Sequence, residues 1–160
     1  MNTRFIRGFT LIELIIVIVV IGMIAMTTLP QWTASSLTLE FQTRRILDDI
    51  RYAQALSLVS GQRYRWVVTS GVTYQITNEA GIAILFPSGS NQVTLSGGAS
   101  FGSFTNLPNS LIAFDSRGAP YINVTYPGTP LSGIAIVTLT AEGITRSIQI
   151  HPETGYGALA

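Results

Sequence analysis

A single acidic residue, Glu13, lies inside a long apolar run near the start of the chain. The run extends from Phe9 to Leu29, and only Gly22 and the polar residues Thr10, Glu13, Thr27 and Thr28 interrupt it. A carboxylate in the hydrocarbon layer of a membrane costs about 2.5–3.5 kcal/mol on insertion scales, so a residue of this kind needs a partner and a purpose. Charge pairing at low dielectric is therefore the chemistry that Glu13 offers.

Residues that could catalyse a reaction are scarce. His151 is the only histidine and the chain has no cysteine, which excludes a thiolate metal site and a cysteine nucleophile. The glycines at 97, 98 and 102 do not make a phosphate loop, because no helix is expected to follow them and the chain has no lysine. We therefore predict a protein that is not an enzyme and needs no cofactor or metal.

Arginines interleaved with aromatic residues form the one cluster that suits nucleic acid: Arg44, Arg45, Arg51, Arg63 and Arg65, with Tyr52, Tyr64 and Trp66. Two observations favour surface ion pairing and sheet packing instead. Asp48 and Asp49 can neutralise Arg44 and Arg45 along a helix. Without Arg4 and Arg7, seven arginines face eight acids, so the remaining chain has no basic field. A nucleic-acid contact through Arg63 and Arg65 is the less favoured alternative.

The apolar run is long enough to span a membrane. Its 21 residues rise about 31 Å as a helix, and Arg4 and Arg7 before it favour a cytoplasmic N-terminus. Two interpretations of the apolar run are a secretory signal peptide and a plain uncleaved membrane anchor. The first lacks a clear small-x-small cleavage site before Pro30, and neither explains Glu13. Pro30 is expected to kink or locally melt the helix.

The rest of the chain predicts an α+β domain. Residues 39–60 favour a helix, because apolar residues recur at three- and four-residue spacing and Gly61 can end it. The apolar stripe comprises Phe41, Ile46, Leu47, Ile50, Ala53, Leu56 and Leu58. Short β-branched or aromatic segments follow at 64–69, 72–77, 82–86, 92–95, 111–114, 121–125, 134–140 and 144–150. We expect a long membrane helix that continues into an amphipathic helix packed on an antiparallel sheet, with a mobile loop at 88–102.

The segment Gly8-Phe9-Thr10-Leu11-Ile12-Glu13 resembles the class III signal of type IV prepilins and type II secretion pseudopilins. The resemblance implies that a prepilin peptidase cuts between Gly8 and Phe9 and methylates the new Phe9 amine. It also implies that Glu13 neutralises the Phe9 amine of a neighbouring subunit during filament growth; a pair within one chain is the local alternative. Pilins of this family commonly have a proline at the position of Pro30.

Later motifs are similar to the GspH/FimT branch of minor pilins and pseudopilins, and to minor pilins of mannose-sensitive haemagglutinin-type systems. They are residues 48–54, Phe114-Asp115-Ser116-Arg117-Gly118, and residues 148–150 followed by Thr154-Gly155. The resemblance implies a leader at 1–8, a membrane and filament-core helix at 9–30, an amphipathic helix at 31–61 and a β-rich head at 62–160.

The implied partners are the prepilin peptidase and methyltransferase and other pilins or pseudopilins. The implied location is the bacterial inner membrane, crossed once, with the head in the periplasm, and afterwards the pilus or pseudopilus. Some FimT-like proteins bind DNA through a basic C-terminal region. This chain has no Lys or Arg after Arg146, so DNA uptake remains the alternative function.

Overall fold

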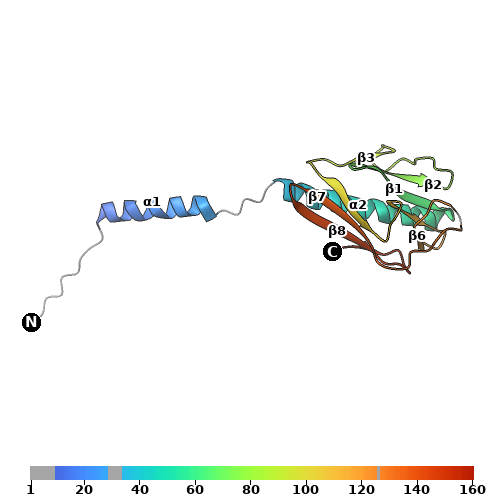
Figure 1. The fold of residues 1–160 in the computed structure, drawn as a ribbon. Helices are drawn as coiled ribbons and strands as arrows, with labels where there is room; N and C mark the ends of the chain where they lie inside the picture. Colours follow the sequence, from blue (N-terminus) through green and yellow to red (C-terminus); the bar gives the residue numbers. More distant parts are fainter. Residues whose placement is uncertain (1–9, 29–33, 126) are drawn as a thin grey trace, which may run out of the picture. The chain divides into compact units, whose positions relative to one another are not determined.

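The computed structural model describes residues 10–28, 34–125 and 127–160. The chain divides into two units, residues 1–32 and 33–160, and each is described by itself. The first unit contains helix α1 (Leu11–Thr28), formed by the apolar run. The second unit begins with helix α2 (Ala34–Ser60) and continues into nine strands within the described residues (Figure 1).

Helix α2 confirms the predicted amphipathic helix and begins five residues earlier than expected. Its buried side chains recur at three- and four-residue spacing: Leu39, Thr43, Ile46, Leu47, Ile50, Ala53 and Ser57. The helix ends at Gly61, which has a φ of +67° and donates its N–H to the Ser57 carbonyl. Phe41 and Leu58, which we expected on the buried stripe, are exposed, and Phe41 has 69% of its surface free.

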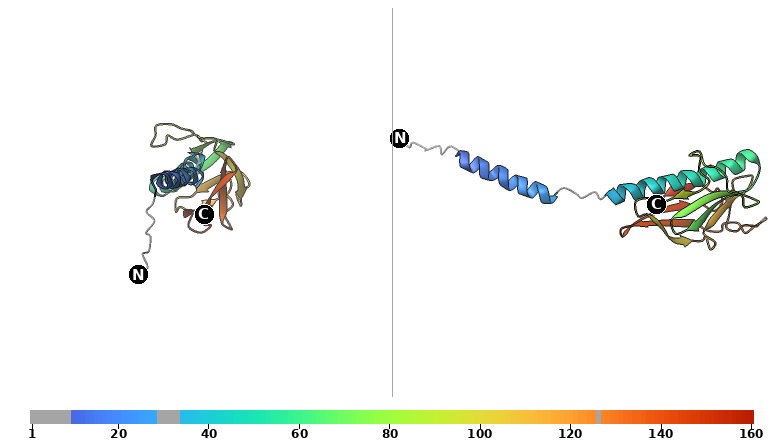
Figure 2. Two further views of the ribbon diagram at one scale, coloured as in Figure 1. Left: turned by 90° about the vertical axis from the view of Figure 1, so that its left-hand side faces the viewer. Right: turned by 90° about the horizontal axis from the view of Figure 1, so that it is seen from above.

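The strands form two antiparallel sheets where the sequence predicted one. The first sheet, in spatial order, contains β3 (Val93–Thr94), β2 (Thr73–Asn78), β1 (Tyr64–Ser70), β5 (Leu111–Phe114) and β6 (Pro120–Tyr121). The second contains β4 (Ser100–Thr105), β7 (Ala135–Ala141), β8 (Ile144–Ile150) and β9 (Gly157–Leu159). Helix α2 lies along both sheets and contacts β1 and β5 of the first and β7, β8 and β9 of the second (Figure 2).

Several predicted strands differ from those observed. The segment 82–86 makes only an isolated bridge between Ala83 and Thr77, because Gly81 has a φ of +82° and the Asn78 side chain accepts the Ile82 N–H, which makes a turn. We expected the segment 88–102 to be a mobile loop around the short strand 92–95. Strand β3 confirms that strand, and β4 begins within the expected loop, at Ser100. Only Tyr121 of the predicted strand 121–125 pairs as a strand residue.

An aromatic cluster joins the two sheets. Trp66 and Tyr74 belong to the first sheet and Phe101 to the second, and their ring centroids are separated by 5.5–6.0 Å. The rings of Phe101 meet the other two nearly edge-on, which is a favourable arrangement for aromatic pairs. Trp66 and Tyr74 are completely buried, so this cluster forms the centre of the core.

Candidate functional site

The processing residues predicted from the sequence, Gly8 and Phe9, and the predicted helix break at Pro30 lie outside the described residues. Glu13 is described, and it occupies the first turn of α1. Its predicted partner, the amine of a processed Phe9, belongs to a neighbouring chain or to a residue outside the described range. Within the described residues, none of the ion pairs involves Glu13.

Thr10 caps the helix that carries Glu13. The Thr10 side-chain oxygen accepts the Glu13 N–H at 3.3 Å, and the Thr10 carbonyl accepts the N–H groups of Glu13 and Leu14 at 3.1 and 3.2 Å. We did not predict this cap from the sequence, although the spacing Thr-x-x-Glu is the signature of a capping box. The capping residue Thr10 lies one residue after the predicted new N-terminus, and α1 begins at Leu11.

The large apolar side chains that the structure describes in α1 lie at the surface of their unit. Every large apolar residue from Leu11 to Ile24 is exposed. Among the residues that the structure describes, no helix is both long enough and apolar enough to cross a membrane.

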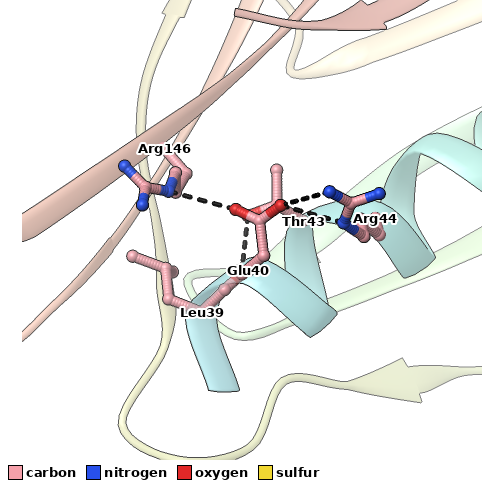
Figure 3. A network of polar contacts seen from close by, with 5 residues as sticks. All are labelled: Leu39, Glu40, Thr43, Arg44 and Arg146. Atoms are coloured by element: carbon pink, nitrogen blue, oxygen red, sulfur yellow. Dashed lines mark hydrogen bonds and ion pairs between the residues drawn. The ribbon is translucent and has the colours of Figure 1, made fainter. Parts of the chain in front are cut away.

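Near its N-terminal end, α2 is joined to β8 by a three-residue ion-pair network, which Figure 3 shows. The Glu40 carboxylate accepts a hydrogen bond from Arg44 at 2.8 Å and another from Arg146 of β8 at 3.2 Å. Arg44 thus reaches back to Glu40 rather than forward to Asp48, and Asp48 lies 3.6 Å from Arg51. In this network the hydrogen bond from Arg146 to Glu40 is the only contact between α2 and β8.

Arg63 and Arg65 are buried, contrary to the expectation that they lie on the surface. Only 6% and 3% of their surfaces are exposed. Arg63 donates to the Asn123 carbonyl at 2.7 Å, and Arg65 donates to the carbonyls of Val124, Asn78 and Glu79. Burial lowers the pKa of Arg65, an effect that the charge of Glu79 opposes and that of Arg63 reinforces. Both guanidinium groups therefore hold loops against the start of β1.

The exposed arginines of the described residues each lie beside a carboxylate. The pairs are Arg44–Glu40, Arg45–Asp49, Arg51–Asp48, Arg117–Asp115 and Arg146–Glu40, at 2.8–4.0 Å. Such surface pairs contribute little to stability, but they neutralise the basic groups that a nucleic acid would contact. The pairing predicted for Arg45 with Asp49 is confirmed, whereas Arg44 pairs with Glu40 instead of Asp48.

Three segments singled out in the sequence meet at one junction. The Gln54 side-chain amide of α2 donates to the Gly118 carbonyl at 2.9 Å and to the Thr154 carbonyl at 2.7 Å. It thereby joins the turn after β5 to the turn after β8. Gly155 packs so closely into this junction that an added Cβ would lie 2.8 Å from the Gly118 carbonyl oxygen. The sequence motifs at 48–54, 114–118 and 154–155 therefore share one structural role.

Asp49 and Tyr74 form a polar pair between α2 and β2. The Tyr74 hydroxyl donates to the Asp49 carboxylate at 2.5 Å. Burial raises the pKa of Asp49 above its ordinary value of 3.8, although the hydrogen bond from Tyr74 and the charge of Arg45 oppose the rise. Burial is the main cause that raises the pKa of the Tyr74 hydroxyl, and the charge of the facing Asp49 carboxylate adds to it. The hydroxyl therefore stays protonated and donates the hydrogen bond.

This pair predicts a pH dependence of stability. Because the folded-state pKa of Asp49 is raised, the folded protein holds a proton that the unfolded chain has released. The contribution of Asp49 to the free energy of unfolding is therefore greatest below pH 3.8 and declines as the pH rises through the folded-state pKa. We expect Asp49→Asn to remove this decline while keeping an acceptor for Tyr74. Denaturant unfolding of the full chain in detergent between pH 4 and 7 measures how the free energy of unfolding changes with pH. Glu153→Gln, a change of an exposed carboxylate, serves as the control. Parallel curves for Asp49→Asn and the wild type would contradict the expectation.

His151 follows β8 directly, and its ring lies 6.2 Å from that of Tyr156. Its neighbours in the adjoining surface hollow are Pro152, Glu153, Thr154 and Tyr156, which include no side chain placed as an activated nucleophile. In the described part of the chain, no group of three or more acidic or histidine side chains is arranged to hold a metal ion.

Comparisons with known proteins agree with the N-terminal motif and the fold. Residues 3–29 match the family model described as the prokaryotic N-terminal methylation motif. No curated protein sequence matches the chain significantly.

Two solved structures resemble the chain. The type IV minor pilin FimU of Pseudomonas aeruginosa PAO1 has a TM-score of 0.55 and 12% identity, over 76% of this chain and 87% of that one. The minor pseudopilin EpsH from the type 2 secretion system of Vibrio cholerae has a TM-score of 0.55 and 14% identity, over 76% and 95%. The two TM-scores show a shared fold, which confirms the expected α+β architecture. The chain thus carries an N-terminal methylation motif and shares the fold of a minor pilin and a minor pseudopilin.

Proposed function

We propose that the chain is a minor pilin or pseudopilin that is cleaved between Gly8 and Phe9 and methylated at Phe9. The observation that carries this proposal is the methylation motif at 3–29, which includes the whole of α1. The head supports it through the likeness to the minor pilin FimU and the minor pseudopilin EpsH. The two TM-scores are equal, so the likeness favours neither a pilus nor a secretion pseudopilus over the other.

The proposed function places the whole apolar run, residues 9–29, in the inner membrane before assembly and in the filament core afterwards. The 18 residues of α1 rise about 27 Å, and the 21 residues of the whole apolar run would rise about 31 Å if all were helical. The uncovered side chains of α1 support this role, because exposed apolar surface of this extent needs a lipid or protein cover. The head then lies in the periplasm, as the positive residues Arg4 and Arg7 favour.

In this proposal Glu13 selects and orients the incoming subunit. Cleavage after Gly8 creates a cationic amine on Phe9, and that amine and the Glu13 carboxylate are each costly alone in a low dielectric. Pairing between subunits neutralises both. Thr10 caps the same helical turn, so the helix carrying Glu13 starts beside the new terminus. The partners are the prepilin peptidase and methyltransferase, and other pilins or pseudopilins.

The arginines of the described residues do not favour capture of DNA by the head. Each exposed arginine of the described residues has a carboxylate within 4.0 Å, and Arg63 and Arg65 are buried. No observation in the head therefore favours a nucleic-acid site.

Replacing Gly8 by Val tests the proposal. We expect the wild-type protein from its native membrane to begin at methylated Phe9, and the Gly8→Val protein to retain residues 1–8, because the peptidase has to accept the residue before the cut. Intact-mass measurement and N-terminal sequencing distinguish the two forms. Gly22→Val, a matched change further along the apolar run where an added Cβ meets no atom within 4 Å, serves as the control and should be processed normally. Normal cleavage of Gly8→Val would refute the processing site.

A further inference from the structure

One side of α2 carries a stripe of three exposed side chains near the N-terminal end of the helix. Leu37, Phe41 and Arg45 follow one another at four-residue intervals, so they lie on the same side of α2. Both sheets pack against the other side of the helix (Figure 2). Leu37 and Phe41 are large apolar residues, yet 46% and 69% of their surfaces are exposed. The head therefore leaves this outer stripe uncovered.

The outer stripe lies close to the apolar run along the chain. Only residues 29–33 separate α1 from α2. An extended chain spans at most about 3.6 Å per residue, so Ala34 stays within about 22 Å of Thr28 whatever the placement of the head. Leu37 and Phe41 follow Ala34 within about two helical turns. Both side chains can therefore reach the medium that surrounds the end of α1.

Arg45 adds to the outer stripe a cationic group that the head engages only weakly. Its side chain is 46% exposed, and its Nε lies 4.0 Å from the Asp49 carboxylate. Within the part of the chain that the structure describes, the Arg45 guanidinium donates no hydrogen bond. Arg44, by contrast, donates to the Glu40 carboxylate at 2.8 Å. Arg45 thus keeps its donors for an acceptor outside the head.

We propose that the outer stripe rests on the surface of the phospholipid bilayer that α1 spans. Leu37 and Phe41 enter the boundary between headgroups and acyl chains, and Arg45 donates to lipid phosphate. Along the chain from α1 the two apolar side chains come first and the cation second, which is the order in which a chain leaving a membrane meets acyl chains and phosphates. This inference rests on the proposed function, because it requires α1 to lie in the membrane.

The small size of the outer stripe favours lipid over a protein partner. A stable protein interface buries about 800 Å² on each partner, which is far more than three side chains supply. Lipids, in contrast, adapt to a narrow convex surface, and an interfacial helix needs only one apolar side with basic residues beside it. Single exposed apolar residues elsewhere on the head are ordinary for a protein surface.

Spin labels on the full-length chain test the contact with lipid. The chain has no cysteine, so Leu37→Cys provides a unique site for a nitroxide, and the protein is reconstituted as single copies in phospholipid nanodiscs. Collisions with oxygen, which enters lipid, are compared with collisions with a nickel chelate, which stays in water. We expect the oxygen-to-nickel ratio to be about tenfold higher for Leu37→Cys than for Val59→Cys, because a side chain at the acyl boundary lies about 5–10 Å inside the membrane surface.

Val59 is a matched control position on the same helix. It is 88% exposed, and it lies about five helical turns beyond Phe41, on the same side of α2. A nitroxide there meets the same helix surface about 27 Å further from the membrane end of the stripe. Equal ratios at positions 37 and 59 would overturn the proposal.

A second change tests the Phe41 side chain itself, independently of the label. In the Leu37→Cys background, Phe41→Ser removes the most exposed apolar side chain of the stripe, and we expect it to lower the oxygen-to-nickel ratio at position 37 about threefold. Val59→Ser in the same background should leave the ratio unchanged. An unchanged ratio in Phe41→Ser would contradict the proposed contact.

A label inside α1 separates this inference from the proposed function. We expect Val17→Cys to give a high oxygen-to-nickel ratio. A high ratio at position 17 with a water-like ratio at position 37 overturns the bilayer contact alone. A water-like ratio at position 17 refutes the membrane location of α1 and both proposals with it. A label at position 37 that is aqueous in nanodiscs but shielded from nickel in filaments assigns the stripe to another subunit and overturns the assignment to lipid.

Discussion

Replacing Glu13 by Val is expected to leave membrane insertion intact and to lower incorporation into filaments at least tenfold. Val makes the apolar run more hydrophobic, so insertion does not suffer. The amine of a neighbouring Phe9 would then be buried without its counter-charge, and breaking a buried pair typically costs about 3–5 kcal/mol. The ratio of the protein in sheared filaments to that in the membrane fraction measures the effect.

Two further variants separate charge pairing from other roles of Glu13. Thr10→Val removes the hydroxyl that accepts the Glu13 N–H but keeps the carboxylate, so it should assemble if Glu13 acts by charge rather than through the cap. Glu153→Val removes one negative charge from the head and should also assemble. Wild-type incorporation of Glu13→Val, or equal defects in Glu13→Val and Thr10→Val, would contradict the proposed pairing.

Replacing Gly155 by Ala is expected to lower the free energy of unfolding by about 2–5 kcal/mol. Gly155 has a φ of +67°, which costs an L residue about 1–2 kcal/mol. The added Cβ would also lie 2.7 Å from the Gln54 amide nitrogen, 2.8 Å from the Gly118 carbonyl oxygen and 2.9 Å from a ring carbon of Phe114. Overpacking of this kind typically costs a further 1–3 kcal/mol.

A matched glycine isolates the two contributions. Gly89 has a φ of +83° but meets nothing within 4 Å of an added Cβ, so Gly89→Ala carries the backbone cost alone. Denaturant unfolding of the full chain in detergent compares the variants, and the difference between them reports the close packing at the Gln54 junction. Equal losses of unfolding free energy in Gly155→Ala and Gly89→Ala would show that the Gln54 junction accommodates the added Cβ with no packing penalty.

The elements that the sequence predicts best are those with a strong repeating pattern. Helix α2 follows from apolar residues at three- and four-residue spacing and from Gly61. Strands β5 and β8 match the predicted ranges because both are bounded by turn residues. Phe41 shows the limit of the pattern: it has helical spacing, yet it lies on the side of α2 that no strand covers.

The features that could not be predicted depend on contacts between distant segments. Strand β4 contains Ser100, Gly102 and Ser103, residue types that are typical of loops. It is a strand because it pairs with β7 of the second sheet. Strand β9 exists because β8 offers a free edge. The burial of Arg63 and Arg65 requires main-chain carbonyls some 13 to 60 residues away, and nothing local in the sequence indicates them.

The distribution of buried side chains along α2 has a mechanical consequence. They extend from Leu39 to Ser57 and face two sheets, and the Glu40–Arg146 contact lies at the end nearest the N-terminal segment. A force applied along the helix axis therefore loads these contacts in parallel, as shear, instead of opening them one after another. The chain has no disulfide to share such a load. The force needed to pull the two sheets away from α2 should thus depend on how many of these side chains have to slide at the same time.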